Sequence, residues 1–467
     1  MNQLITYDAP AGAVLRDDYK VSVRTPGGEW QNIPVYEVRV DMHHVREASM
    51  AYFDMQGEVE VEIKYHGDLK EAVIRPLSTQ LPFSLFQDTV QFTLNRPLKL
   101  SVECNGDRFG NLHLFANPLE KDIPDLSSPD VRVVRPGIHR VPDLLRNLPG
   151  TLYFTPGMHY IEETLLQIPS GKTVYLAGGA VLVGSLVCDH VQNVEIRGRG
   201  VLYLADFHRF SAFRGIRIVY SSNISVEGIT VVDPPHYSIF IGQSYGIEIR
   251  NFKAFSTRGW SDGIDMMASG NIDIRDVFMR NSDDCIAVYG SRWDYRGGTN
   301  DVMVRDSILW ADVAHPMMIG IHGNHEEDGD IIENLRFDNI DILEHHEPQP
   351  NYWGAMAINA GDSNTVRDVV FNNIRIETIE SGQLFDIRVV HNQDYNPNPG
   401  RRIENVLFKD IQYPGGTLNP SRIHGFDDDR TVNGITFDNL RIGEERILNR
   451  DHPALEINGY ARNIKFI

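Results

Sequence analysis

A short unit recurs along the chain from residue 223 to residue 467. Each copy begins with Asn, Gly or Asp, continues with alternating apolar and variable positions, and reaches a second polar or glycine residue before the next apolar position. The nine copies start at Asn223, Gly246, Asn271, Asp301, Asn334, Asp368, Asn405, Gly434 and Asn463, at intervals of 23 to 37 residues. Such repetition is typical of a solenoid, in which each winding buries its apolar side against its neighbours.

The pattern inside the unit indicates which solenoid this is. Apolar positions alternate along short segments, and no helical period of about 3.6 residues runs across them, so helical and leucine-rich repeats fit poorly. Polar and glycine residues stand where two short strands would meet at a bend. We therefore predict a right-handed parallel β-helix.

The first 125 residues lack this unit. Apolar and polar residues alternate in segments 19–24, 35–40, 59–65 and 98–103, with turn residues between them. This pattern is typical of an antiparallel β-sandwich. A polar stretch at 117–129 marks the boundary, so we expect an all-β chain with an N-terminal β-sandwich (1–125) and a catalytic β-helix domain (126–467).

Acidic side chains stand at the leading ends of successive strands. Asp262 and Asp284 are 22 residues apart, Asp283 adjoins Asp284, and His315 opens the next winding. If 22 residues make one winding, the carboxylates stack at about 4.8 Å, the spacing of neighbouring strands. Like charges at this distance repel one another, and structural needs alone rarely produce them, whereas glycoside hydrolysis needs one protonated and one ionised carboxyl group. We predict that Asp262, Asp283 and Asp284 are catalytic.

Composition limits the partners of the chain. Asp and Glu number 64 against 44 Lys and Arg, which gives a net charge of -20 and argues against a nucleic-acid partner. The three cysteines imply no disulfide framework. Neither a signal-like start nor an apolar run of membrane-spanning length is present, so we expect no membrane partner and a cytoplasmic location, or secretion if a signal peptide was removed. The oligomeric state stays open.

The motifs resemble those of a known clan of enzymes. Asp262-Gly263-Ile264-Asp265, the segment 283–287 and His315 followed by Ile319-Gly320 resemble the motif series of the polygalacturonase family, glycoside hydrolase family 28. With a sandwich before the helix, the chain is closer in architecture to family 49, which contains dextranase and isopullulanase. The resemblance covers residues 130–440.

This resemblance implies hydrolysis with inversion. Asp283 would protonate the leaving oxygen, while Asp262 and Asp284 would activate the attacking water. Inversion usually places the acid and base carboxyl groups about 6.5–9.5 Å apart. His315 would tune the carboxylates or hold substrate, or it would simply cap its strand.

The chain departs from family 28 where that family binds the galacturonate carboxylate. The Arg-x-Lys pair on the winding after the histidine is absent, because the strand here is Gly354-Ala355-Met356-Ala357-Ile358-Asn359. This favours a neutral glycan or oligosaccharide, plausibly an α-glucan. Sugars stack on aromatic rings and bond to polar groups. The expected substrate-binding residues are His315, Tyr289, Trp293, Trp353, Arg388 and Asn359.

Other functions stay open at this point. A pectic hydrolase could bind its substrate carboxylate through Arg388 or Arg292. A lyase or fructotransferase is disfavoured, because no lysine accompanies the acids. A non-catalytic carbohydrate-binding solenoid would behave unchanged after Asp283→Asn. The His-rich segments 322–327 and 345–347 lack the helical spacing of zinc hydrolases and are interpreted as solvated loops, so we expect neither a metal nor another cofactor.

Overall fold

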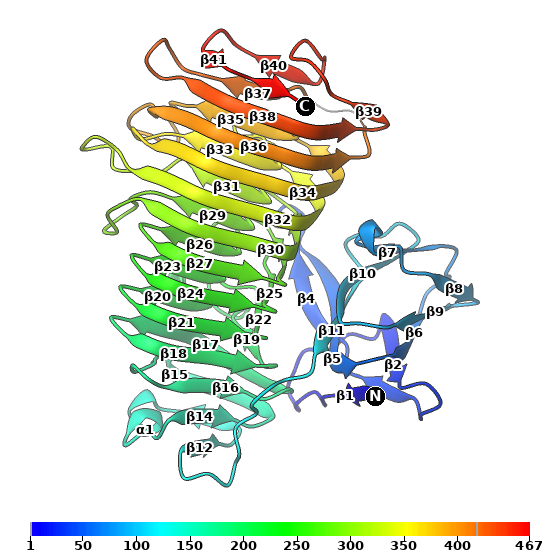
Figure 1. Cartoon of the computed structure of the whole chain (residues 1–467). Coiled ribbons are helices and arrows are strands. Elements are labelled where there is room, and N and C mark those ends of the chain that lie inside the picture. Colours follow the sequence, from blue (N-terminus) through cyan, green and yellow to red (C-terminus); the bar gives the residue numbers. More distant parts are fainter. Residues whose placement is uncertain (1, 417–418) are drawn as a thin grey trace.

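The computed structural model describes residues 2–416 and 419–467 as a tall stack of parallel windings with a smaller sandwich beside it (Figure 1). The predicted fold class is confirmed. One sheet of the sandwich contains β1 (Gln3–Ile5), β4 (Tyr36–Val40), β5 (Arg46–Gln56), β7 (Ala72–Arg75), β10 (Leu98–Cys104) and β11 (Leu112–Pro118). The other contains β2 (Tyr19–Arg24), β3 (Gln31–Ile33), β6 (Val59–Tyr65), β8 (Phe83–Phe86) and β9 (Thr89–Leu94). Pairing in these described sheets is antiparallel except between β5 and β11.

The described part of the β-helix is one continuous 31-stranded sheet. Its first windings are β12 (Val131–Val134), β13 (Gly137–His139), β14 (Thr151–Phe154), β15 (Gly157–Gln167), β16 (Thr173–Leu176) and β17 (Ala180–Asp189). The face with the candidate site consists of β20 (Ile216–Val219), β23 (Ile239–Gly242), β26 (Ile264–Met267), β29 (Ile286–Tyr289), β31 (Met317–Gly320), β33 (Met356–Ala360), β35 (Phe385–Val389) and β37 (Ser421–His424). The boundary predicted near residue 125 falls between β11 and β12.

Two further faces complete each winding. The second face begins with β18 (Gln192–Gly198), β21 (Ser222–Glu227), β24 (Tyr245–Arg250) and β27 (Gly270–Arg275), and the third with β19 (Val201–Tyr203), β22 (Thr230–Val232), β25 (Lys253–Phe255) and β28 (Phe278–Asn281). Long strands then span both faces: β30 (Thr299–Ala311), β32 (Ile331–His346), β34 (Thr365–Ser381), β36 (Arg402–Tyr413) and β38 (Val432–Ile442). The remaining elements are β39 (Glu445–Arg446), β40 (Leu455–Ile457), β41 (Ala461–Arg462), β42 (Lys465–Phe466), α1 (Val141–Leu145), η1 (Leu77–Thr79) and η2 (Arg209–Ser211). None of the helices described is long and apolar enough to cross a membrane.

The repeating Asn, Asp and Gly positions are corners of the windings. All nine predicted unit starts have positive φ, for example 55° at Asn223 and 71° at Gly246. Glycine, and among other residues Asn and Asp, adopt this left-handed conformation at the lowest cost, which explains the pattern. One detail differs from the prediction of two short strands per unit. From β30 onward the second corner, such as Asn339 in β32, lies within a continuous strand.

The interior of the helix repeats from winding to winding. Phe337, Phe371, Phe408 and Phe437 form a stack with successive ring centroids 4.9, 4.9 and 5.2 Å apart. Such stacking buries each ring against its copies above and below and adds to the free energy of unfolding.

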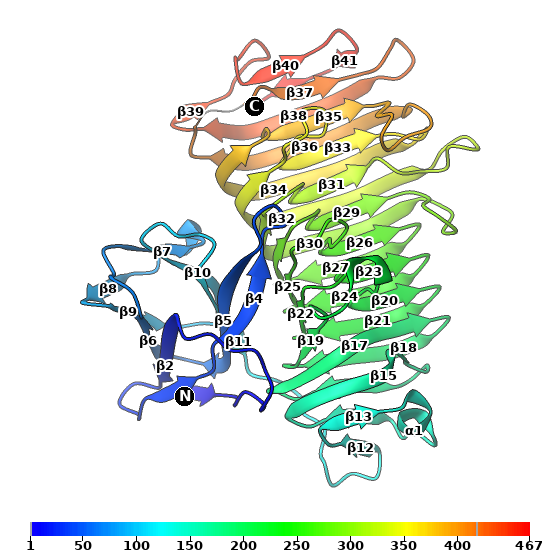
Figure 2. The ribbon, with the colours of Figure 1, turned by 180° about the vertical axis from the view of Figure 1, so that it is seen from behind.

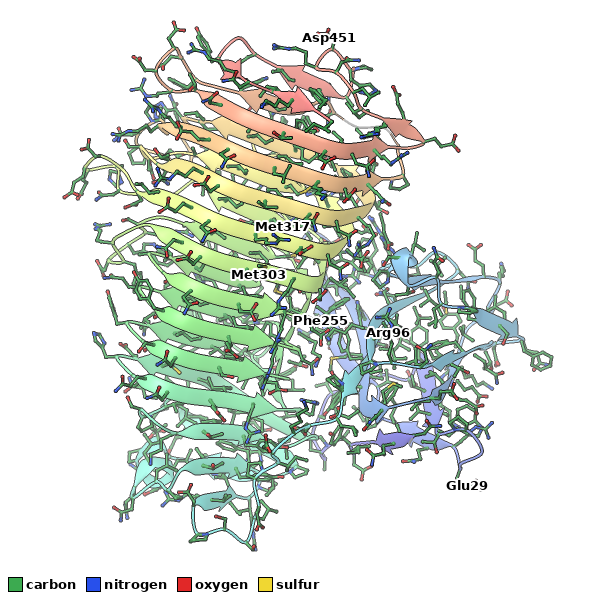
Figure 3. All side chains as sticks on the ribbon, viewed as in Figure 1. Glu29, Arg96, Phe255, Met303, Met317 and Asp451 are labelled. Atoms are coloured by element: carbon green, nitrogen blue, oxygen red, sulfur yellow. The ribbon has the colours of Figure 1, made fainter. Side chains whose placement is uncertain are left out.

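The sandwich packs against the third face of the helix, as the view from behind also shows (Figure 2). Val38 of β4 and Phe115 of β11 share a buried cluster with Phe255, Phe278 and Trp310 of that face. Side chains fill the space between the two parts around Phe255 (Figure 3). The segments 276–301 and 306–334, between repeat units, contain β28, β29 and β31, so their longest stretches outside strands are 290–298 and 321–330, with shorter turns at 282–285 and 312–316.

Candidate active site

Asp283 and Asp284 lie in the turn between β28 and β29. Successive residues of a regular strand point to opposite faces, so only an irregular segment lets both acids serve one site. Hydrogen bonds to Ser256 hold this turn: the Ser282 N–H donates to Ser256 Oγ at 3.1 Å, and the Ser282 hydroxyl donates to the Ser256 carbonyl at 2.9 Å. The turn is therefore fixed before any substrate arrives.

Strand register stacks the predicted site residues on three consecutive windings. Ile264 of β26 pairs with Ile286 of β29, which pairs with Met317 of β31. Two positions before these lie Asp262, Asp284 and His315. One oxygen from each of Asp262, Asp283 and Asp284 lies within 4.8 Å of the other two. The structure thus brings the three predicted carboxylates together.

The short separation is a consequence of strand spacing. Glycosidases that invert usually keep acid and base about 6.5–9.5 Å apart, and those that retain about 5–5.5 Å. Here Asp262 and Asp284 lie at equivalent positions just before neighbouring strands β26 and β29, and neighbouring strands are about 4.8 Å apart in any sheet. Three oxygens this close could also hold a divalent cation. That the reaction needs no metal stays a prediction, and an assay with a chelator would test it.

The environment raises the pKa of two of the three acids. Burial raises the pKa of Asp283 to about 6 and the Asp284 carboxylate adds to this, although Asp283 accepts N–H bonds from Trp260 at 2.7 Å and Asp284 at 3.0 Å. Burial and then the Asp265 carboxylate raise the pKa of Asp262 well above its usual value. A proton on Asp283 at mildly acidic pH is what a general acid requires.

His315 is fully buried and bonded at both ring nitrogens. Nδ1 lies 2.6 Å from Asp284 Oδ1, and Nε2 lies 2.5 Å from the Tyr352 carbonyl, which can only accept. Burial alone would lower the pKa of His315, but Asp284 outweighs it and raises the pKa to about 9. A positive imidazolium against Asp284 suits a carboxylate that acts as base. Neither nitrogen is left for substrate, so the geometry is that of a positioning residue.

The three aromatic residues predicted to bind substrate differ in accessibility. Trp293 is 45% exposed, whereas Tyr289 is buried and donates its hydroxyl to Asp284 Oδ2 at 3.3 Å. Trp353 is half-buried, with its ring 5.4 Å from the Arg422 guanidinium. Trp293 is the most accessible stacking surface of the three.

Asn359 and Arg388 belong to a network around the buried Asp386. Asn359 donates to Asp386 Oδ2 at 3.1 Å, and Arg388 donates to both carboxylate oxygens at 2.7 Å. Arg388 also donates to the Asn351 carbonyl at 2.5 Å. Arg422 donates to the same carboxylate at 3.2 Å, so Arg388 is held in an ion-pair network with Asp386 and Arg422, which the sequence alone did not indicate.

Two further acids of the site were missed in the sequence. Asp265 in β26 is fully buried, has no hydrogen-bond donor among the described residues, and has a pKa raised well above its usual value by burial. Glu347 is 1% exposed, and burial raises its pKa to about 7. The interpretation of 345–347 as a solvated loop is therefore wrong for His345 and Glu347. The sequence feature that could have identified Asp265 was its place in the same short motif as Asp262.

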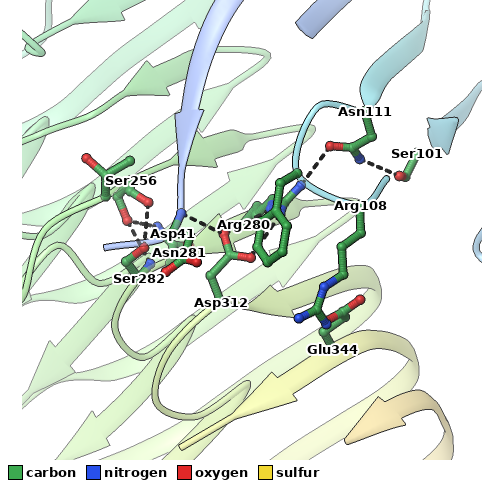
Figure 4. Close-up of polar contacts among 12 residues, drawn as sticks. Asp41, Ser101, Arg108, Asn111, Ser256, Arg280, Asn281, Ser282, Asp312 and Glu344 are labelled. Carbon is green, nitrogen blue, oxygen red and sulfur yellow. Dashed lines mark hydrogen bonds and ion pairs between the residues drawn. The ribbon is translucent and has the colours of Figure 1, made fainter. Parts of the chain in front are cut away.

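The sandwich supports the turn that carries Asp283 and Asp284 from behind. Arg280, three residues before Asp283, is fully buried and donates to Asp312 at 2.9 Å and to Asn111 of the sandwich at 2.9 Å. The Asp41 N–H, at the end of β4, donates to Asp312 at 3.3 Å. Figure 4 shows this network beside the Ser256, Asn281 and Ser282 contacts of the turn. Packing of the two parts thus fixes the position of Asp283.

Residues 212–445, which include every site residue above except the sandwich contacts, match the profile of glycosyl hydrolases family 28. The chain belongs to this family. Exopolygalacturonase B of Aspergillus niger is 26% identical over 254 residues, which cover 52% of this chain and 53% of that protein. Rhamnogalacturonase A of the same species is 23% identical, over 52% of this chain and 61% of that protein. The chain thus matches about half the length of the curated relatives.

Two solved structures resemble this family 28 chain in fold over more of its length. Dex49A from Penicillium minioluteum superposes with a TM-score of 0.68 at 17% identity, covering 99% of this chain and 96% of that one. A family 28 exopolygalacturonase from Yersinia enterocolitica gives 0.54 at 12% identity, covering 88% and 96%. At these identities the likeness concerns the fold, and the sandwich-plus-helix architecture is shared almost end to end with Dex49A.

The raised pKa of Asp283 predicts the alkaline limit of activity. A general acid must carry its proton, so kcat/KM should fall as pH rises through about 6, where Asp283 deprotonates. The measurement is kcat/KM from pH 4 to 9, with circular dichroism showing that the fold persists. A rate that stays constant between pH 5 and pH 8 would contradict the role of Asp283.

Proposed function

We propose that this family 28 chain is an inverting glycoside hydrolase in which Asp283 protonates the leaving oxygen and Asp262 and Asp284 activate water. The proposal is supported by the proton that Asp283 keeps up to about pH 6 and by the imidazolium of His315 against Asp284. Asp262 and Asp284 lie at equivalent positions of neighbouring windings, so one water can bond to both at once, and Asp284, held by the His315 imidazolium, is the carboxylate that accepts its proton. Asp283 then stands beside them as the proton donor.

The sugar bound toward the C-terminal windings is neutral in this proposal. The observation that carries it is the environment of β33 and β35: Ala357 and Asn359 supply no cation, and Arg388 is held by Asp386. Arg388 and Arg422 of β37 both donate to Asp386, so a substrate carboxylate there would have to displace these bonds to gain a positive partner. An α-glucan such as dextran is the first candidate, given the architecture shared with Dex49A.

A panel of glycans tests this specificity. We expect reducing sugar from dextran or pullulan and much less from polygalacturonate, because the latter places a carboxylate against Ala357 and Asn359. If reducing sugar is released from polygalacturonate alone, the substrate is pectic and the proposal of a neutral sugar is wrong. Release from no glycan would favour a binding solenoid.

The second candidate, a pectic hydrolase, is favoured by one observation. The Arg292 guanidinium donates to the Tyr237 hydroxyl at 2.6 Å and has no carboxylate within 4.0 Å among the described residues. Two curated relatives are named as an exopolygalacturonase and a rhamnogalacturonase. Arg292 lies toward the N-terminal windings, however, on the other side of the carboxylates from Asn359.

The anomeric form of the first product tests the mechanism. Inversion by direct water attack releases a sugar of the opposite anomeric configuration, which proton NMR detects before mutarotation. The carboxyl separation alone would favour retention. A retained first product would therefore overturn the proposed roles and make one aspartate a nucleophile.

A further inference from the structure

Asp265 is a buried acid without a hydrogen-bond donor. Its backbone in β26 pairs with Phe240 of β23 on one side and with Ala287 of β29 on the other. The side chain is fully buried, and neither carboxylate oxygen has a hydrogen-bond partner among the described residues. Buried polar groups are almost always bonded, and an ionised carboxylate without any donor is especially costly. An isolated negative charge is therefore unfavourable at this position.

The neighbouring acid, Asp262, has the same deficiency. Its Oδ1 atom is also enclosed and without a partner in the described part of the chain. The two carboxyl groups are close enough for a hydrogen bond between their side chains, and after burial the Asp265 carboxylate is the largest cause of the raised pKa of Asp262. Two carboxylates in contact repel each other, whereas one proton between them makes the contact a hydrogen bond. A single proton thus satisfies one oxygen of each residue.

The backbone around the two acids is held on both sides. The Ser238 N–H donates to the Asp262 carbonyl at 2.8 Å. From the next winding, the Asp284 carbonyl accepts the Gly263 N–H at 2.8 Å. A side chain on Gly263 would meet the Cys285 carbonyl oxygen at 2.3 Å, so this segment fits closely between its neighbours. Because the backbone is fixed, the two acids are not free to separate.

Other charged and titratable groups face the pair from the adjoining windings. Burial is the largest influence on both carboxyl groups and raises both pKa values well above the usual range, and Asp283 and Asp284 raise them further. Arg292 lowers both, but it makes no ion pair within 4.0 Å in residues 2–416 and 419–467, and its guanidinium donates to the Tyr237 hydroxyl at 2.6 Å. The Tyr289 hydroxyl donates to Asp284. None of these groups supplies the missing donor.

We propose that Asp262 and Asp265 share one proton and act as a single unit with one negative charge, in which Asp265 is a positioning residue for Asp262. The inference rests on the proposed hydrolase function, in which Asp262 binds the attacking water. The hydrogen bond from Asp265 fixes the orientation of the Asp262 carboxyl group before substrate arrives, as a preorganised site requires. The proton of the water still goes to Asp284, beside the His315 imidazolium.

Infrared difference spectroscopy tests the shared proton without turnover. The spectra of full-length Asp265→Asn and Asp262→Asn are each subtracted from that of the wild type at neutral pH, in water and in heavy water. We expect at least one difference to contain the C=O stretch of a carboxylic acid, shifted in heavy water, because each substitution removes the pair. Asp294→Asn, at an exposed position, should give no such band. Carboxylate bands alone in both differences would overturn the shared proton, and this result does not depend on whether the chain hydrolyses any glycan.

Two substitutions of similar size separate positioning from packing. Asp265→Leu fills the space without a polar group and should lower kcat about 10²-fold with little change in KM, as a small misplacement of Asp262 would. Asp265→Asn can still donate to Asp262 and should lose less than about tenfold, the contribution of one hydrogen bond. Its alkaline limit of kcat/KM should stay at the wild-type pH, because the charge of the site is unchanged.

Circular dichroism shows whether each variant folds, and Asp265→Ala replaces Asp265→Leu if the latter does not. Equal kcat values for the Asn and the apolar variant would overturn the positioning role of Asp265. An alkaline limit displaced in Asp265→Asn would show instead that both acids are ionised in the wild type.

Discussion

We expect Asp283→Asn to abolish hydrolysis while leaving the fold intact. Asn has nearly the same shape but cannot donate a carboxylic proton to the leaving oxygen, so we expect kcat to fall at least about 10³-fold. The bonds that Asp283 accepts from the Trp260 and Asp284 N–H groups can still be made by the amide oxygen. Initial rates on the best substrate of the panel measure the loss of activity. Circular dichroism and a melting curve show whether the fold is kept.

The matched control for this variant is Asp294→Asn. Asp294 lies exposed in the neighbouring loop, and its replacement should change kcat less than about twofold, as is usual for surface positions. If Asp283→Asn retains full activity, the assignment of the general acid is wrong. If neither protein hydrolyses any glycan, the chain is a binding solenoid.

We expect Arg280→Met to lower the free energy of unfolding of the chain. The substitution removes the cation and leaves Asp312, whose side chain is 2% exposed, buried without its partner. Breaking a buried pair in this way costs about 3–5 kcal/mol in the free energy of unfolding. Urea denaturation followed by tryptophan fluorescence and circular dichroism measures the loss.

Arg305→Met is the control for charge removal at the surface. Its pair with Asp273 is 39% and 33% exposed and should contribute about 0–1 kcal/mol. The double variant Arg280→Met, Asp312→Leu should recover part of the loss, because no lone charge then stays buried. Equal stability of the Arg280 and Arg305 variants would show that the sandwich contact does not hold the catalytic turn.

The site depends on packing between distant parts of the chain. The turn that carries Asp283 is held from inside the helix by Ser256 and from the sandwich by Asn111, through Arg280. These contacts fix the donor and acceptor atoms before binding, which is how enzymes avoid reorganisation during reaction. The sandwich is therefore a structural support for the acids, independent of any sugar contact of its own.

Much of this architecture follows from the repeat in the sequence. A recurring Asn, Asp or Gly before alternating apolar residues specifies a left-handed corner and a strand, and the interval between copies specifies one winding. Because parallel stacking keeps equivalent positions in register, the 22-residue interval was enough to place Asp262 beside Asp284. Strand spacing is the same in every sheet, so the proximity of these two carboxyl groups follows from the sequence alone.

The partners of the polar side chains were decided only by the tertiary structure. Arg388 looked available for substrate, but it is bound to Asp386; Glu347 looked solvated, but it is buried. A repeat pattern determines which way a strand runs and which residues stack. It does not determine which charged side chains meet, because that depends on side-chain conformation, as for Arg388 and Asp386 within β35, and on loops whose lengths and paths differ from winding to winding.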